Sequence, residues 1–273
     1  MQLLEILAKG EPTVIDLAQP LQAGMPCSPT HPGFHLALTQ RHGDGPPRPD
    51  GITGSAELIV LGGHVGTHMD ALCHVAADGL MYGGIEAATA VTGGRYRVHG
   101  IEQVPPIVCR GVLFDIPRLR RVARLGPAEA ITEADLMATG VEPRPGDVAL
   151  IRTGWPQLWH DPCAYVATGT GVPGLVPEGA NWLAECGVRA VGGDTIALER
   201  IEAETGHSML PVHRILLAER GINIIEVMNL EELGASGVTE FLFVCAPLPV
   251  VGATGAPVRP LAVLDGGRDG NAA

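Results

Sequence analysis

The chain has 273 residues, is 46% hydrophobic and carries a formal charge of −12 at pH 7. It is long enough to bury a substantial core without disulfides. Its few, scattered basic residues argue against nucleic acid or a membrane surface as a partner. Because it shows no secretory signal pattern and no stretch of membrane-spanning length, we expect a soluble, cytoplasmic protein.

The first elements predicted along the chain are short strands bounded by Gly, Pro or polar turn residues. Their apolar runs predict largely buried strands at 13–17, 57–61, 111–116 and 147–152. The stretches 42–54 and 168–178 are rich in Pro and Gly, and we interpret them as long surface loops.

Helices and strands are predicted to alternate in the second half. The helix predicted at 132–138 begins at Thr132 with Asp135 three residues on, as in a capping box, and helices at 178–186 and 210–220 each end before a glycine. Further strands are predicted at 190–194, 222–226, 240–244 and 259–264. The pattern indicates an α/β fold. Without a repeat or a linker, we predict a single domain over 1–265 and a frayed tail at 266–273.

Three of the ten histidines lie in residues 64–74, together with an aspartate. These residues are His64, His68, Asp70 and His74. Neutral imidazoles bind divalent metals well, and a carboxylate offsets the charge of the ion. The cluster therefore predicts a metal site.

The spacing of this cluster predicts a bend in the chain. On one helix, His64 and His68 would point about 200° away from Asp70 and His74, and on one strand the four would spread over roughly 33 Å. Glycines at 62, 63 and 66 permit a bend. We predict a strand, a loop and then a helix, with Asp70 and His74 sharing a face of its first turns.

The segment resembles the His-x-Gly-Thr-His-x-Asp-x-x-x-His signature of the cyclase family, which includes bacterial kynurenine formamidase and isatin hydrolase. The resemblance is to the longer members and extends over most of the chain, through Asp16-Leu17, Asp78-Gly79 with Tyr82, Arg144 to Val148, Ile151 to Trp155, Gly193 to Thr195 and Gly252 to Pro260. It implies a mixed β-sheet or barrel-like core flanked by helices, of the swivelling β/α/β type. It also implies a homodimer or homotetramer.

The resemblance implies particular site residues. The metal ligands it implies are His64, His68, Asp70, His213 and Glu226. It implies His74 as the residue that transfers protons, and His207 is a rival of His213 whose surroundings fit the family less well. The cofactor implied is one or two divalent ions, Zn²⁺ or Mn²⁺.

The predicted reaction is hydrolysis of a small-molecule amide, lactam or lactone, such as an aryl-formamide or an isatin-like compound. A divalent ion makes water more acidic and polarises a carbonyl, while His74 would move the proton. Two alternatives remain open: a cyclase that forms polyketide-type rings or lactones, and a non-catalytic metal-binding protein. The chain departs from the family pattern at Leu72 and Val227 and has no Trp near Cys27 or Ser28, which leaves the substrate open.

Two further residues received competing interpretations. Cys73 adjoins His74, but neighbouring side chains usually point apart, so a thiol nucleophile is not favoured. Asp194 follows a predicted strand, where it could line the pocket, hold a ligand histidine or form a structural turn.

Overall fold

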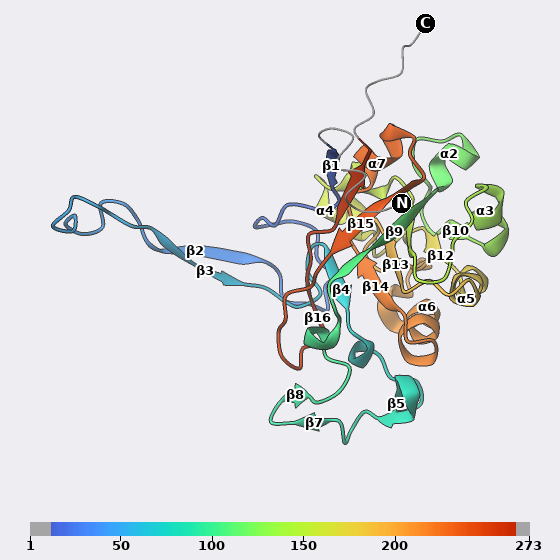
Figure 1. Ribbon diagram of the computed structural model, residues 1–273, viewed down its shortest axis with the longest axis horizontal. Coiled ribbons are helices and arrows are strands. Elements are labelled where there is room, and N and C mark those ends of the chain that lie inside the picture. The colour runs from blue at the N-terminus through green and yellow to red at the C-terminus, as the bar shows by residue number, and fades with distance from the viewer. Residues whose placement is uncertain (1–11, 266–273) are drawn as a thin grey trace, which may run out of the picture.

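A curled, open sheet of nine strands forms the centre of the computed structural model, which describes residues 12–265 (Figure 1). Across the sheet the strands are β1 (Thr13–Asp16), β17 (Leu261–Leu264), β15 (Glu240–Cys245), β9 (Ile107–Asp115), β11 (Val148–Arg152), β13 (Ala190–Gly193), β14 (Asn223–Glu226), β4 (His68–Asp70) and β16 (Gly255–Pro257). The four strands β9, β11, β13 and β14 are parallel, and antiparallel strands flank them on both sides. The expected α/β fold with a mixed sheet is confirmed.

The central strands are buried on both faces, which explains why their sequences are nearly continuous apolar runs. In β11, Val148 and Leu150 join one hydrophobic cluster, while Ala149 and Ile151 join another on the opposite face. The second cluster lies under the helices, so alternate residues of one strand hold two layers together.

Few helices flank this sheet. They are α2 (Ile116–Arg120), α3 (Glu133–Ala138), α4 (Pro162–Val166), α5 (Pro177–Glu185), α6 (Pro211–His213), which continues as a π-helix over Arg214–Glu219, and α7 (Glu231–Ser236). The capping box predicted at the start of α3 is present, with Thr132 and Asp135 each accepting a backbone N–H of the other. Short 3-10 helices cover Leu72–His74, Tyr82–Gly84, Ile101–Gln103, Trp155–Leu158 and Gly206–Ser208.

In the part of the chain that the structure describes, four small two-stranded sheets lie outside the main one. They pair β2 (His35–Gln40) with β3 (Ala56–Val60), β5 (Leu80–Met81) with β6 (Ile85–Glu86), β7 (Val91–Thr92) with β8 (Arg95–Tyr96), and β10 (Ala130–Ile131) with β12 (Gly174–Leu175). The β2–β3 hairpin projects far from the body of the molecule (Figure 1). We call β2, β3 and the loop 41–55 between them the arm.

Two predictions for residues 56–74 were wrong. The strand expected to be buried at 57–61 is β3 of the arm, and every residue of β3 is exposed. Asp70 does not start a helix but ends β4, because residues 68–70 pair with both β14 and β16. The hydrogen bonds of two neighbouring strands override the local helix pattern, and only Leu72–His74 form a single 3-10 turn.

The predicted frayed tail, 266–273, lies outside the described residues. Within residues 12–265, no helix is long and apolar enough to cross a membrane.

Candidate metal centre

Strand β4 carries two of the predicted site residues on one face. His68 and Asp70 are two residues apart, so their side chains point the same way from the strand. Glu226 on β14 lies directly opposite His68 in the antiparallel register. The tight turn before β4 needs Gly66, whose φ is +67° and where an added Cβ would lie 2.4 Å from Leu21 Cδ2. The sheet thereby places three ligand-type side chains next to one another.

The imidazole of His68 is oriented by the backbone. Its Nδ1 donates to the carbonyl of Gly66 at 2.8 Å, so in the neutral ring the lone pair lies on Nε2. That Nε2 lies 3.4 Å from Asp70 Oδ1 and 3.4 Å from Glu226 Oε2. The ring is held in the tautomer that a metal ligand needs.

His213 is oriented in the same way, but by a carboxylate. Its Nδ1 donates to Glu199 Oε1 at 2.6 Å, while its Nε2 lies 3.1 Å from Glu226 Oε1 and 3.6 Å from Asp70 Oδ2. Glu199 also accepts the backbone N–H groups of Val212 and His213, and so fixes the start of α6. Sequence reasoning missed Glu199, because an isolated glutamate between a strand and a helix carries no local signal.

Three buried atoms at this point have no hydrogen-bond partner within residues 12–265: His68 Nε2, Asp70 Oδ2 and Glu226 Oε1. Ligand atoms of these three residues all lie within 4.8 Å of one another. Leaving buried polar atoms unpaired is costly, whereas imidazole nitrogen and carboxylate oxygen are good ligands for divalent transition metals. The residues present therefore fit a divalent cation.

The protonation of the two histidines reflects the same arrangement. Burial lowers the pKa of His68, but the carboxylates of Asp70 and Glu226 outweigh it and raise that pKa to about 10. The pKa of His213 is raised as well, because Glu199 and Glu226 outweigh its burial. The carboxylates that face the two rings therefore favour a positive charge at this point. A divalent cation would supply that charge.

His64 and His74 lie beside this group and share Asp70 with it. Ligand atoms of His64, Asp70 and His74 also fall within 4.8 Å of one another. His64 Nδ1 donates to Asp70 Oδ1 at 2.7 Å, and its Nε2 contacts Thr254 Oγ1 at 2.8 Å. His64 thus differs from His68, because both of its ring nitrogens already have partners.

The His74 ring stacks on His64 with 3.9 Å between ring centroids. Burial lowers the pKa of His74 to about 4, with Asp70 opposing this change. The ring is therefore neutral near pH 7 and able to accept a proton.

A small pocket opens onto these residues. It has a volume of about 40 Å³, and its lining includes the apolar side chains Ile196, Ala197 and Leu210. His31 and Ser28, which sequence reasoning did not single out, also line it. His207 lies at the same pocket, where its Nδ1 contacts Ser28 Oγ at 3.2 Å. His213, and not His207, faces the carboxylates of the cluster.

Two rival interpretations are now resolved by geometry. The Cys73 thiol contacts the carbonyl of Ala253 and is buried, which raises its pKa to about 12, so it is no nucleophile. The Asp194 carboxylate accepts N–H and O–H groups of Thr153 and the N–H of Gly154. Asp194 is a structural residue that holds the turn after β11.

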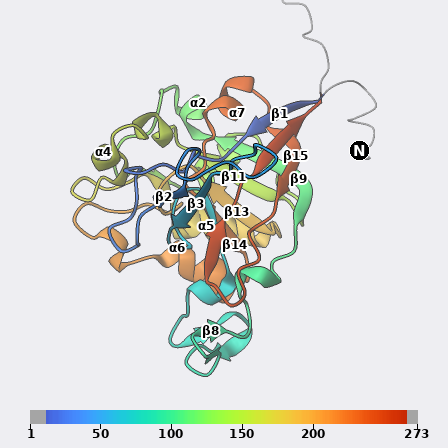
Figure 2. The ribbon, with the colours of Figure 1, turned by 90° about the vertical axis from the view of Figure 1, so that its left-hand side faces the viewer.

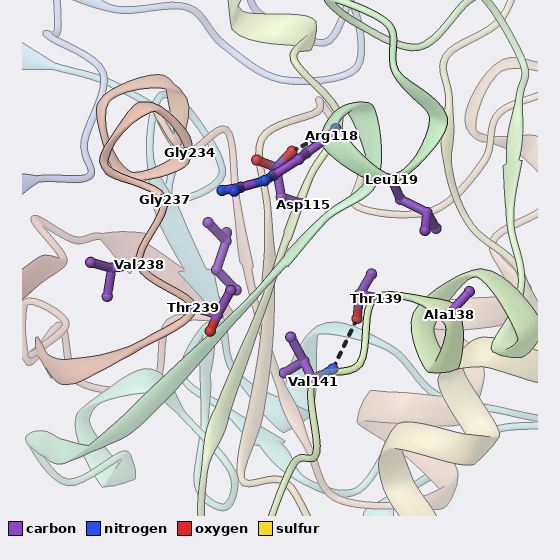
Figure 3. Close-up of a pocket in the computed structure, with 11 residues that line it drawn as sticks. Asp115, Arg118, Leu119, Ala138, Thr139, Val141, Gly234, Gly237, Val238 and Thr239 are labelled. Carbon is purple, nitrogen blue, oxygen red and sulfur yellow. Dashed lines mark hydrogen bonds between the residues drawn. The ribbon is translucent and has the colours of Figure 1, made fainter. Parts of the chain in front are cut away.

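A second pocket, of about 310 Å³, lies between α2, α3 and α7 (Figure 3). Among residues 12–265, no histidine or cysteine lines it, and the one carboxylate in the lining, Asp115, caps α2 and pairs with Arg152 at 2.8 Å. Despite its larger volume, this pocket lacks the ligand groups and the proton acceptor of the histidine cluster. Position and chemistry favour the smaller pocket as the functional one.

Comparisons with known proteins show which family the chain resembles. The profile of the family described as "Putative cyclase" matches residues 15–200. The chain is 25% identical to isatin hydrolase of Roseibium aggregatum over 263 residues, covering 94% of each chain. It is 26% identical to kynurenine formamidase of Delftia acidovorans over 246 residues, covering 89% of this chain and 94% of the relative.

Among solved structures, the crystal structure of a protein described as a novel cyclase superposes with a TM-score of 0.84 at 28% identity, covering 96% of this chain and 93% of that chain. The curated relatives are hydrolases by name, and both align over nearly their whole length. On the family profile, the shared fold and these relatives, this chain belongs to the cyclase family.

Proposed function

We propose that this protein is a metal-dependent hydrolase that cleaves the C–N bond of a small linear or cyclic amide. The observation that carries the proposal is the approach of His68 Nε2 and His213 Nε2 to the carboxylates of Asp70 and Glu226. Three atoms of this group, His68 Nε2, Asp70 Oδ2 and Glu226 Oε1, have no hydrogen-bond partner within residues 12–265. We assign these four residues as ligands of Zn²⁺ or Mn²⁺. We also assign His64 as a ligand. Where two ions are bound, His64 would bind the second ion together with Asp70, which belongs to both ligand groups.

A divalent ion in this site would polarise the substrate carbonyl and make water a stronger nucleophile at neutral pH. The protein residues have separate tasks. Glu199 holds His213 in its ligand tautomer, and Asp70 holds His64 through the Nδ1 hydrogen bond. His74 accepts the proton of the attacking water on its imidazole and passes it to the leaving nitrogen.

The names of the relatives and the lining of the pocket support this substrate class. One relative is named for hydrolysis of isatin and the other for hydrolysis of a formamide. Apolar Ile196, Ala197 and Leu210 beside the polar cluster suit a flat, apolar compound that carries one amide carbonyl. An aryl-formamide or an isatin-like lactam meets this description.

The test is metal dependence together with a substrate panel. Purified protein is assayed for bound divalent ions, stripped with a chelator, reloaded separately with Zn²⁺ and Mn²⁺, and offered formyl-anilines, isatins and lactones. We expect hydrolysis that disappears on stripping and returns on reloading. A protein that binds no divalent ion contradicts the proposal. Tight metal binding without any hydrolysis would instead favour a ring-forming cyclase or a metal-binding protein without activity.

A further inference from the structure

The histidines of the proposed metal centre each turn one ring nitrogen toward the carboxylates and the other away from them. For His68 the outer nitrogen is Nδ1, which donates to the carbonyl of Gly66. For His213 it is also Nδ1, which donates to the carboxylate of Glu199. A carbonyl or a carboxylate only accepts, so each of these partners fixes one tautomer of its ring. In both rings the nitrogen that remains for an ion is Nε2.

His64 is turned the other way round. Its Nδ1 lies 2.7 Å from Asp70 Oδ1, and the same oxygen lies 3.4 Å from His68 Nε2. Its Nε2 is on the far edge of the ring, 2.8 Å from Thr254 Oγ1. The nitrogen of His64 that faces the centre is therefore Nδ1, and Thr254 occupies the outer position.

Packing holds the His64 ring in this orientation. The side chain is 9% exposed. A Cβ on Gly255 would lie 2.6 Å from His64 Cε1, so the ring occupies space that a glycine leaves open. The rings of His74 and His31 stack on it, with 3.9 Å and 5.3 Å between ring centroids. An imidazole enclosed in this way keeps its Nε2 directed at Thr254.

Thr254 is itself placed by the backbone on both sides. It lies immediately before β16, the edge strand beside β4, and its carbonyl accepts the N–H of Ala71 at 2.8 Å. The red segment that leads from β15 to β16 runs past β7 and β8 in both views (Figures 1 and 2). There the carbonyl of Gly252 accepts the N–H of Tyr96 in β8 at 3.2 Å. The hydroxyl of Thr254 therefore meets the histidine ring from a fixed position.

A hydroxyl differs from the partners of the other two rings, because it both donates and accepts hydrogen bonds. Within residues 12–265, Thr254 Oγ1 has no hydrogen-bond partner besides His64 Nε2. While His64 Nδ1 donates to Asp70, the hydroxyl can donate to the lone pair on Nε2. Once Nδ1 offers its own lone pair to an ion, the ring hydrogen lies on Nε2 and the hydroxyl accepts it. One side chain thus supports His64 in both states.

We infer that Thr254 positions His64 to bind the metal ion through Nδ1, the opposite ring nitrogen from the one that His68 and His213 use. The inference rests on the proposed metal centre, and it names the ligand atom and the supporting residue that the proposal leaves open. Thr254 touches the ligand and not the ion, so its effect passes through the orientation of the ring. Partners of ligand histidines are commonly worth about 10- to 100-fold in metal affinity.

The first experiment measures Zn²⁺ affinity by competition with a chromophoric chelator. Thr254→Val removes the hydroxyl at nearly constant volume, whereas Thr254→Ser keeps the hydroxyl and removes only the methyl group. We expect the affinity for at least one bound ion to fall by about 10- to 100-fold in Thr254→Val and to stay near the wild-type value in Thr254→Ser. The matched control is Thr239→Val, since Thr239 is exposed and lines the second pocket.

Wild-type affinity in Thr254→Val overturns Thr254 as the positioning residue. Equal losses in Thr254→Val and Thr254→Ser overturn it as well, because the hydroxyl would then not account for the effect. Both results leave the metal centre intact. A wild-type protein that binds no ion contradicts the metal centre itself, and this inference with it.

The second experiment observes the ring nitrogens directly and does not depend on how the variants fold. Nuclear magnetic resonance of ¹⁵N-labelled, Zn²⁺-loaded wild type shows which nitrogen of each histidine carries the hydrogen, once the ring signals are assigned through the backbone. We expect the hydrogen on Nε2 in His64 and on Nδ1 in His68 and His213. A His64 ring that keeps its hydrogen on Nδ1 in the loaded protein is a hydrogen-bond donor to Asp70 and not a ligand, which overturns the inference.

Discussion

Strands β3 and β4 are only seven residues apart in sequence, yet they reverse the usual relation between polarity and burial. In apolar β3, Leu58 is 55% exposed, whereas in β4 His68 and Asp70 are 2% and 0% exposed. Exposed contiguous apolar surface and buried charge are the two unusual cases in a folded protein. Each marks a place where the chain alone does not complete its interactions. For β4 the proposed complement is a metal ion, and for β3 it is the second copy that the family resemblance implies.

The largest effect is expected at Asp70, because it belongs to both ligand groups. Asp70→Asn keeps the shape of the side chain but removes its charge. Since changes outside the ligand shell already cost 10–100-fold in metal affinity, we expect this variant to lose more than ~100-fold and to lose turnover with it. Metal titration and steady-state kinetics measure both, with Asp50→Asn, at an exposed aspartate in the loop of the arm, as the control. A variant that keeps its ion and its turnover would remove Asp70 from the proposed centre.

His74→Ala separates proton transfer from metal binding. We expect turnover to fall by ~10² to 10⁴, the usual loss for a general acid–base residue, while the bound metal per chain stays unchanged. His160→Ala, at an exposed histidine, is the matched control. Turnover within about threefold of wild type would contradict the proton-transfer role, because general acid–base catalysis is worth more than that. A matching loss of metal would instead make His74 a ligand in the group it forms with His64 and Asp70.

Glu199→Gln should have a smaller effect that acts through His213. The two carboxylate oxygens of Glu199 accept the backbone N–H of Val212 and the Nδ1–H of His213. In the glutamine side chain an NH₂ group replaces one of these oxygens, so one of the two hydrogen bonds is lost. We expect metal affinity to fall by about 10- to 100-fold, with ligands and fold retained. Competition with a chromophoric chelator measures the affinity, and Glu185→Gln, at an exposed glutamate on α5, is the control. Unchanged affinity would leave Glu199 with only its structural role at the start of α6.

The predictability of the fold also differed between regions. Strands β9, β11, β13 and β14 and helices α3 and α5 were predicted near their observed positions, because buried parallel strands are apolar runs and helix ends carry capping residues. Strand β3 of the arm was wrongly predicted as buried. An apolar strand that faces a partner has the same sequence pattern as one that faces a core, so local sequence does not separate them.

The site divides in a similar way. His64, His68, Asp70 and His74 are close in sequence, so their clustering predicted a metal site without a structure. His213 and Glu226 were found through family resemblance, since nothing local connects them to the cluster. Glu199 and Thr254 were missed, because single polar residues reveal their partners only once the chain brings them together.

The smallest effect is expected in the arm, and it sharpens the contrast with β4. Met69 is 0% exposed between the two site residues of β4, so Met69→Ala should cost ~2–5 kcal/mol of unfolding free energy. Leu58→Ala should change the unfolding free energy of dilute, monomeric protein by under about 0.5 kcal/mol, as at other exposed sites. Urea unfolding over a range of protein concentrations measures both. If Leu58 packs against a second copy, the effect of Leu58→Ala should grow with concentration while that of Met69→Ala stays constant. A Leu58→Ala loss as large as that of Met69→Ala in dilute protein would mean that the arm folds onto its own body.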